Sequence, residues 1–391
     1  MPFFRDLVHR PRNLFLRKAL FQVHLWAGIA FSLYMVVIAL TGAILVFEDE
    51  LTATTLPARL TPYNAAHTMA IPEEMRKFTE ACPGCTATFL TMPSPAVPAF
   101  QIRATDTNHH EFALVGDPIT GALHPYPRTW VNWVHDLHLY LLLGSAYGVQ
   151  VNGVGAIVLL VLALTGLLLW WQGIRNWTRA LGISLRTNWR RINFDAHHAI
   201  GIWTLGIVSW WAISGVYFAW YRQFADAVNA ISPLRGMLSP AISPIAAANG
   251  RASLSAVISA AQQASPQGRL FGISDPSLAG STIFAQMDLR APGDFAHRDI
   301  VTIATSNARV LTIWHYGQNQ SLGDWIMWSM HPLHFGTIWG LPFKILWFLL
   351  GVSLAVLTLT GLIMYWNRYL RHRIQPQKPH QTRSRVVPIR G

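Results

Sequence analysis

Four long runs of apolar residues alternate with polar segments along the chain. They cover about 21–47, 150–171, 198–221 and 343–366. Close to twenty apolar residues, at a rise of about 1.5 Å per residue, cross the roughly 30 Å hydrocarbon core of a bilayer. The pattern therefore predicts an α-helical membrane protein built on a bundle of four transmembrane helices.

The first and third runs repeat one arrangement of histidine and glycine. In each run a histidine is followed by glycines after four and eighteen residues, and a threonine or serine precedes the second glycine. The residues are His24, Gly28, Thr41 and Gly42 in the first run, and His197, Gly201, Ser214 and Gly215 in the third. Ionisable residues at bilayer depth are costly and mark functional sites. We interpret the chain as two repeated halves, because sites in repeated membrane proteins form between the repeats.

A second repeated motif precedes the second and fourth runs. It places two histidines three residues apart, with a Thr-Gly pair further on. The residues are His135, His138 and Thr165-Gly166 in the first half, and His331, His334 and Thr360-Gly361 in the second. One helix from His138 to Trp171 would be about 50 Å long, which exceeds the bilayer. We therefore expect glycines and Asn152-Gly153 to break it, leaving the four histidines in surface helices or just above the spans.

The two long polar segments have the pattern of small α+β domains. Each contains one helix-like stretch followed by strand-like stretches that turn residues separate. The first has its helix at 71–81, strands at 86–92, 100–106 and 110–116, and a turn at Asp117–Gly121. The second has its helix at 254–264, strands at 281–290, 299–305 and 309–317, and a turn at 306–308. We expect a helix packed on an antiparallel sheet in each domain.

The distribution of charge predicts the orientation in the membrane. Only 12% of the residues are charged, against about a quarter in soluble domains. Of the 30 Lys and Arg residues, 17 lie before the first run, in the loop 172–196, or after residue 366. By the positive-inside rule these segments are cytoplasmic and the two long polar segments are external. Nucleic-acid binding is the weaker interpretation of the net charge of +12, because the arginines lie at the ends of spans.

Pattern and charge together predict a multi-pass membrane protein, with both termini cytoplasmic and the lipid bilayer around its spans. The first run is too long for the apolar core of a cleaved signal peptide, so we interpret it as a retained anchor. The expected segments are a cytoplasmic N-terminal segment 1–20, a transmembrane helix 21–47, an external domain 48–130, a surface helix and transmembrane helix 131–171, a basic cytoplasmic loop 172–196, a transmembrane helix 197–221, an external domain 222–323, a surface helix and transmembrane helix 324–366, and a basic cytoplasmic tail 367–391.

The two cysteines, Cys82 and Cys85, form a CxxC motif in the first external segment. No second CxxC is present for a zinc site, and the residue after Cys85 is not the histidine that covalent haem attachment requires. A structural disulfide is the favoured interpretation in an oxidising compartment. A redox role stays open as the second one.

Topology sorts the candidate histidines into two clusters. His24 and His197 lie at the cytoplasmic side, whereas His138 and His334 lie at the external side. Two imidazoles from facing helices at each side are the arrangement of two b-type haems in a helical bundle. Zinc or copper can use the same ligands, but two imidazoles alone seldom make a closed zinc site. The glycines favour haem as well, since a flat macrocycle needs small residues beside it.

Neighbouring histidines remain as alternate ligands. His135 and His331 each lie three residues before the favoured external ligand. His198 lies about 100° round the helix from His197, and we favour His197 because it keeps the register of His24. The plain alternative is that the glycines serve helix packing and the histidines only face the membrane interface.

A site for a soluble electron donor is missing from the sequence. GxGxxG after a strand, the Walker lysine motif and GxSxG are all absent. If electrons cross the bundle, a membrane quinol or a separate cytoplasmic reductase must supply them.

These motifs resemble those of the PepSY-associated transmembrane-helix family, in particular the bacterial inner-membrane ferric-siderophore reductases and iron-regulated membrane proteins. The likeness covers roughly 15–370, although the second external unit lacks the Asp-Pro-x-Thr-Gly turn at 306–308. The matching positions are His24, His138, His197 and His334, with Asp117, Pro118, Thr120 and Gly121 in the first external unit. The resemblance implies PepSY-like external domains, two bound b-type haems, and reduction of ferric chelates on the periplasmic side.

The leading hypothesis is therefore a haem-dependent oxidoreductase with two bis-histidine haem b groups that reduces ferric siderophores. Hard oxygen donors hold Fe(III) better than Fe(II), so one electron releases the metal. Two alternatives are a membrane-anchored module that binds or regulates an envelope protein, and a transporter for iron chelates. A haem absorption spectrum separates the first hypothesis from both.

Overall fold

The computed structural model describes residues 15–57, 60–126, 128–174, 177–235, 250–290 and 296–371. Most of the predicted N-terminal segment, and the tail beyond residue 371, lie outside these ranges. The chain forms two compact units. The first unit contains Met1–Val36, Val161–Leu205 and Ser353–Gly391, and the second contains Val37–Leu160 and Gly206–Val352.

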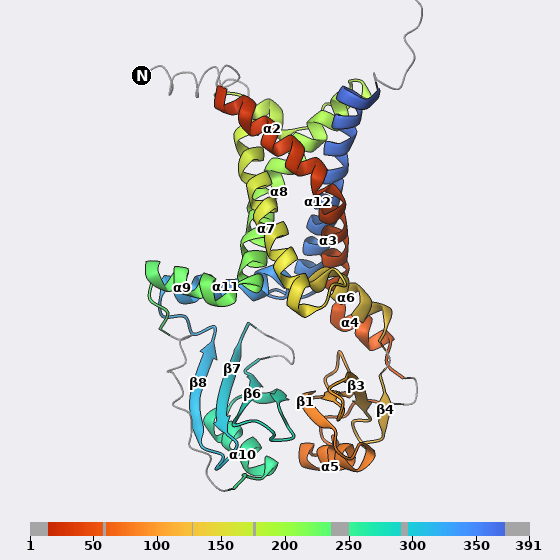
Figure 1. The fold of residues 1–391 in the computed structure, drawn as a ribbon, viewed down its shortest axis with the longest axis vertical. Coiled ribbons are helices and arrows are strands. Elements are labelled where there is room, and N and C mark those ends of the chain that lie inside the picture. The colour runs from red at the N-terminus through yellow and green to blue at the C-terminus, as the bar shows by residue number, and fades with distance from the viewer. Residues whose placement is uncertain are drawn as a thin grey trace, which may run out of the picture. The chain divides into compact units, whose positions relative to one another are not determined.

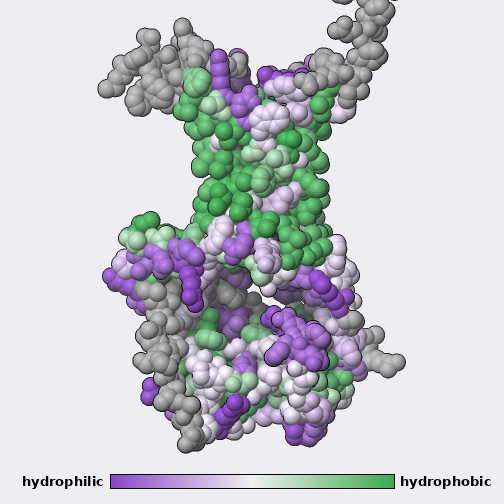
Figure 2. All heavy atoms as spheres, viewed as in Figure 1, coloured by the Kyte–Doolittle hydropathy of each residue, from purple (hydrophilic) through white to green (hydrophobic). Residues whose placement is uncertain are grey.

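Three helices in the described ranges are each long and apolar enough to cross a membrane. They are α7 (Ser145–Trp170), α8 (Trp189–Ala219) and α12 (Leu341–Tyr365), which continues as a π-helical turn η3 (Trp366–Leu370). On the face drawn in Figure 2, hydrophobic residues predominate over the long helices, whereas hydrophilic and hydrophobic residues mix over the strands (Figures 1 and 2). The protein is thus an α-helical membrane protein that also contains α+β parts.

The first predicted span is a bent pair of helices rather than one continuous helix. Helices α2 (Phe15–Ala30) and α3 (Ser32–Leu45) meet at 65°, and only together do they pass the length and composition criteria for a span. The Ser32 hydroxyl donates to the Ile29 carbonyl over 2.9 Å at the bend. Such a bond competes with the helix ladder and bends helices. The described part therefore has three single spans, or four if the bent pair crosses as one.

The predicted surface helices precede the second and fourth apolar runs. Helix α6 (Trp130–Tyr140) precedes α7, and α11 (Leu322–Phe335) precedes α12. Positive φ angles break the chain at Leu141, Leu142 and Gly144 after α6, and at Gly336 after α11. The break predicted at Asn152-Gly153 is wrong, because both residues lie inside α7. The Asn152 amide instead binds carbonyls of α6, as described below.

The strands of both external segments form one antiparallel sheet of eight strands, in the order β4-β3-β2-β1-β5-β6-β7-β8 (Figure 1). The sequence indicated two sheets, but β1 pairs with β5 and places Leu90 opposite Ile273, both fully buried. The strands are β1 (Thr86–Thr91), β2 (Phe100–Thr105), β3 (Glu111–Gly116), β4 (Leu123–Pro125), β5 (Arg269–Ser274), β6 (Thr282–Asp288), β7 (Arg298–Ala304) and β8 (Val310–Tyr316).

Two helices supply the rest of the core of this sheet. Helix α5 (Ile71–Ala81) contributes the buried Met75 and Phe78, and α10 (Leu254–Ala264) contributes Val257 and Ala261. Both helices lie where the sequence predicts them. Strand β5 was missed, because RLFGIS carries an arginine and a glycine in place of a clear apolar alternation.

The order of elements repeats in the two halves of the chain. A long helix leads to a short helix, α4 (Glu48–Thr54) or α9 (Tyr221–Ile231), and then to a helix with four strands. A surface helix and a long apolar helix complete each half, and a short 3₁₀ helix η2 (Trp177–Leu181) lies between the halves. This order agrees with the two repeated halves inferred from the histidine motifs.

Candidate functional site: two histidine pairs

The first histidine pair lies in the first unit. His24 is on α2 and His197 is on α8, and their ring centroids are 6.4 Å apart with planes at 87°. Each of these histidines sits one turn before a glycine of the repeated motif. At these glycines, Gly28 and Gly201, an added Cβ would meet only leucine side chains, at 3.8 and 3.6 Å.

The second pair lies in the second unit and has the same separation. His138 on α6 and His334 on α11 have ring centroids 6.4 Å apart with planes at 59°. Burial lowers the pKa of His138 to about 4, with a further contribution from His135. Burial lowers the pKa of His334 to about 3, helped by His138 and His331. Both rings are therefore neutral at physiological pH, which is the form that binds metals.

Each of the four histidines has a hydroxyl beside its Nδ1 atom. The four Nδ1-to-oxygen distances lie between 2.7 and 3.0 Å. The pairs are His24 with Thr165, His138 with Thr41, His197 with Thr360, and His334 with Ser214.

These hydroxyls decide the tautomer of each ring. Every one of the four donates its single proton to a backbone carbonyl of its own helix, as Thr165 does to Val161 over 2.7 Å. The hydroxyl oxygen can then only accept, so the histidine Nδ1–H must be the donor. The Nε2 lone pair is left for a ligand. Second-shell acceptors of this kind fix the orientation of metal-binding imidazoles and raise their basicity.

Glycines bring three of the rings close to the backbone. A Cβ at Gly42 would lie 2.8 Å from Cε1 of His138. At Gly166 and Gly361 it would lie 3.3 Å from Cε1 of His24 and His197. The sequence analysis interpreted these glycines as small residues that leave room for a flat macrocycle. The structure instead places the edges of histidine rings against them. Gly215 differs, because its nearest neighbour is the Cβ of Ala156 at 2.8 Å.

The alternate histidines make other contacts. His198 donates from Nδ1 to the Phe194 carbonyl over 2.9 Å. The His135 ring lies beside the Asp136 carboxylate, at 3.4 Å. The His331 ring stacks on Phe335, with centroids 4.2 Å apart and planes at 14°. The structure therefore brings together His24 with His197 and His138 with His334 as the pairs with matched geometry.

The donor set fits haem better than a bare metal ion. A metal held at about 2.0 Å from two opposed imidazole nitrogens places the ring centroids about 6 Å apart, as in both pairs. Within the described residues, no group of three or more His, Cys, Asp or Glu side chains could hold a metal. Haem supplies four equatorial nitrogens and needs only two axial ligands from the protein. Each pair offers two imidazoles whose Nδ1 atoms are bonded to hydroxyls and whose Nε2 atoms remain as ligand atoms.

The cysteines of the CxxC motif form a disulfide between Cys82 and Cys85, and Cys82 is the residue after α5. A catalytic thiol pair favours a helix N-terminus, where the dipole stabilises the thiolate. The structural interpretation of the motif therefore agrees with its place at a helix C-terminus.

The model of the PepSY-associated TM region matches residues 21–368, which is most of the chain. The chain belongs to this family. The resemblance noted from the span motifs is thereby confirmed, and the matched range contains all four paired histidines. No curated protein matches the chain.

The hydroxyl partners are the residues of this PepSY-associated TM protein that sequence reasoning missed. All four stand directly before a glycine of the repeated motif, in the pairs Thr41-Gly42, Thr165-Gly166, Ser214-Gly215 and Thr360-Gly361. The repetition was visible in the sequence as a spacing. Its chemical meaning required the structure, because each hydroxyl lies at least 97 residues from its histidine along the chain.

Proposed function

We propose that this PepSY-associated TM protein is a transmembrane electron-transfer oxidoreductase that holds two b-type haems and reduces ferric chelates. One observation carries the proposal: two pairs of imidazoles have equal separation, and every ring has its Nδ1 bonded to a Ser or Thr hydroxyl. A chance packing of histidines does not repeat the same donor and acceptor four times.

The chain's own residues have defined tasks in this proposal. His24 and His197 hold one haem iron through Nε2, and His138 and His334 hold the other. The hydroxyls keep each ring in the Nε2-ligating tautomer, and burial keeps the second pair neutral. Bound haem supplies one-electron redox chemistry at a potential that ligand basicity and the polarity of the site set.

The substrate and the donor follow from chemistry and from the predicted topology. A ferric siderophore or another ferric chelate takes one electron on the periplasmic side, and its oxygen donors then hold the resulting Fe(II) weakly. A quinol or a cytoplasmic reductase supplies the electron from the other side of the bacterial inner membrane. The Lys and Arg pattern supports this orientation, with both termini in the cytoplasm.

The absorption spectrum of protein from haem-replete cells tests the proposal. We expect a low-spin b-type spectrum with about two haems per chain. His24→Ala and His138→Ala should each remove about one haem. His198→Ala and His135→Ala are matched controls that should keep both, because the Nδ1 atoms of these rings contact the Phe194 carbonyl and the Asp136 carboxylate and not a Ser or Thr hydroxyl. A folded, colourless wild-type protein would overturn the proposal.

Reduction of the substrate requires a second measurement. Dithionite-reduced protein is mixed with a ferric hydroxamate chelate and a colorimetric Fe(II) trap under argon. We expect haem reoxidation with Fe(II) trapped in equal amount. Haem that stays reduced in the presence of the chelate would show an electron-transfer protein with another acceptor.

A further inference from the structure

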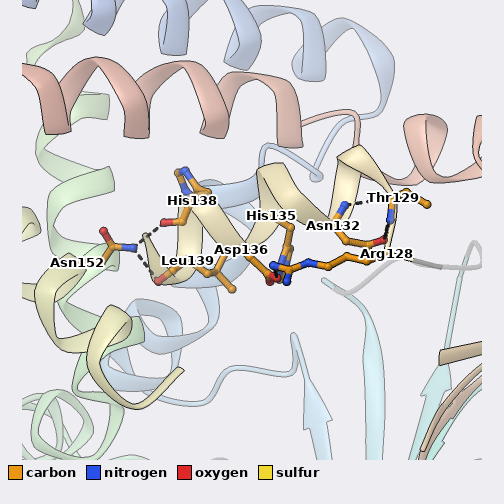
Figure 3. Close-up of polar contacts among 8 residues, drawn as sticks. All are labelled: Arg128, Thr129, Asn132, His135, Asp136, His138, Leu139 and Asn152. Atoms are coloured by element: carbon orange, nitrogen blue, oxygen red, sulfur yellow. Dashed lines mark hydrogen bonds and ion pairs between the residues drawn. The ribbon is translucent and has the colours of Figure 1, made fainter. Parts of the chain in front are cut away.

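Asn152 joins the end of the helix that carries His138 to the following apolar helix. Its side-chain Nδ2 lies 2.6 Å from the His138 carbonyl and 2.7 Å from the Leu139 carbonyl (Figure 3). Carbonyls in the last turn of a helix have no partner inside that helix. Asn152 on α7 therefore caps α6, which ends at Tyr140.

The packing of α7 against α6 leaves little freedom at this contact. A Cβ at Gly148 would lie 2.1 Å from the Tyr140 carbonyl oxygen, so glycine is required for the close approach. The His138 backbone is thus held by α7, and its ring is held by the Thr41 hydroxyl on α3. A residue fixed at both backbone and ring has one position available for its Nε2 atom.

The second half of the chain contains an equivalent helix cap, made by a different side chain. Trp347 on α12 donates from Nε1 to the Leu333 carbonyl over 2.7 Å, next to His334. The Trp347 side chain is 7% exposed, and a Cβ at Gly336 would lie 2.6 Å from its Cγ. In each half, a side-chain N–H from the apolar helix caps the surface helix beside its paired histidine. His24 and His197, by contrast, lie inside α2 and α8 and need no such cap.

We propose that Asn152 and Trp347 are positioning residues for the histidine pair His138 and His334. They act through the backbone of α6 and α11 and do not touch the iron themselves. This inference rests on the proposed haem function for its spectroscopic consequence. The physical claim, that each cap fixes the end of a ligand-bearing helix, stands on the hydrogen bonds alone.

The spectroscopic test uses a chain in which only one haem site remains. In the His24→Ala background, the remaining haem belongs to His138 and His334. Asn152→Leu removes both donors at nearly constant volume, and we expect the low-spin EPR signal to shift and to convert partly to high spin. Trp347→Phe removes one donor and should act in the same direction. An unchanged EPR signal and midpoint potential in both variants would overturn the proposal.

Gln150→Leu is the matched control on the same helix. Gln150 accepts from Trp220 Nε1 over 2.6 Å and does not bind α6. It should leave the EPR signal of the His24→Ala protein unchanged. A spectrum that shifts equally in Gln150→Leu and Asn152→Leu would show a general effect of polarity in α7 and would count against a cap.

Amide hydrogen exchange tests the cap without any haem. In protein stripped of haem, Asn152→Leu should speed exchange in the last turn of α6 about tenfold, because two carbonyls of that turn lose their side-chain donor. The last turn of α11 should stay unchanged in this variant and respond to Trp347→Phe. Unchanged exchange in both helices would overturn the proposal, whether or not the wild-type protein binds haem.

Discussion

Both histidine pairs combine imidazole rings with Ser or Thr hydroxyls, but different helices carry the rings and the hydroxyls in the two pairs. In the pair His24 and His197, the histidines lie on α2 and α8 and the hydroxyls lie on α7 and α12. In the pair His138 and His334, the hydroxyls lie on α3 and α8 and the histidines lie on the short helices α6 and α11. Helix α8 therefore supplies a ring, His197, to one pair and a hydroxyl, Ser214, to the other.

This difference shows which contacts fix the histidine positions in each pair. A histidine inside a long helix is fixed by the helix itself, so its hydroxyl only needs to orient the ring. A histidine near the end of a short helix depends on additional contacts, which the caps at α6 and α11 provide. The pair on the short helices should therefore respond more strongly to changes in its supporting residues.

The largest effect is expected from Ser214→Ala. For His197 the Leu357 carbonyl, 3.0 Å from Nδ1, adds to the hydroxyl as an acceptor. For His334 the Ser214 hydroxyl, 2.7 Å away, is the Nδ1 acceptor that the structure shows. Its loss should weaken haem binding at that pair by about 10–100-fold and raise the potential, because the imidazole becomes a poorer donor.

Thr360→Ala is the matched control for this effect. His197 keeps the Leu357 carbonyl at 3.0 Å as an acceptor when the Thr360 hydroxyl is removed. Haem titration of the stripped proteins, followed by potentiometry, measures both variants. Equal losses in Ser214→Ala and Thr360→Ala would show that the acceptors do not act individually.

A smaller and more selective effect on haem binding is expected from alanine substitutions at the glycines beside the histidine rings. Gly42→Ala places a Cβ 2.8 Å from His138 Cε1 and must displace the ring, whereas at Gly166 and Gly361 the distance is 3.3 Å. Gly42→Ala should therefore lower occupancy of the second pair several-fold, since contacts under about 3 Å force a shift. Gly166→Ala and Gly361→Ala should only shift the spectrum of the first pair.

Gly215→Ala is the control that distinguishes displacement of a histidine ring from a general effect on helix packing. Its Cβ would meet Ala156 and not His334, so it should lower thermal stability without a selective change in the second haem. The measurement is the haem-to-protein ratio together with a melting curve for each of the four alanine variants. A selective loss of the second haem in Gly215→Ala would contradict the assignment of close contacts.

Hydropathy and spacing predicted much of this arrangement, for reasons that are local. The apolar runs gave α7, α8 and α12, and the shared register of His24 and His197 marked two residues whose rings the structure brings together. The bend between α2 and α3, where the Ser32 hydroxyl binds the Ile29 carbonyl, is not revealed by apolar composition. The sequence analysis favoured His138 and kept His135 as an alternate ligand, because the two lie three residues apart in one motif.

The remaining features depend on contacts between distant residues. Strand β5 pairs with β1, and a Cβ added at Gly272 of β5 would lie 3.0 Å from the Phe89 ring of β1, so the weak strand signal of β5 is explained only by its partner. Asn152-Gly153 was expected to break a helix because one continuous helix from His138 to Trp171 would exceed the bilayer. The structure shows that the Asn152 amide instead binds two carbonyls of α6, a contact that the sequence does not reveal.

The smallest effect on either histidine pair is expected from a substitution of Glu74, which lies on α5, a helix that packs on the sheet. The Glu74 side chain is fully buried, and neither carboxylate oxygen has a hydrogen-bond partner among the described residues. Burial raises its pKa to about 7, with Asp117 adding to the rise and Lys77 opposing it. The unfolded value is near 4.5. Between these values the folded protein binds more protons, so stability falls as the pH rises from about 4.5 to 7.

Glu74→Gln should remove this pH dependence and leave the spectra of both pairs unchanged. Above pH 7 the variant gains stability, on the order of 1–2 kcal/mol after allowance for solvent screening, because the wild-type protein must then bury a charge. Glu80→Gln is the matched control on the same helix, since its carboxylate is 61% exposed. Melting curves at pH 5, 6, 7 and 8 would contradict the prediction if wild type and Glu74→Gln ran parallel. A spectral change in Glu74→Gln would instead show that the sheet influences the histidine pairs.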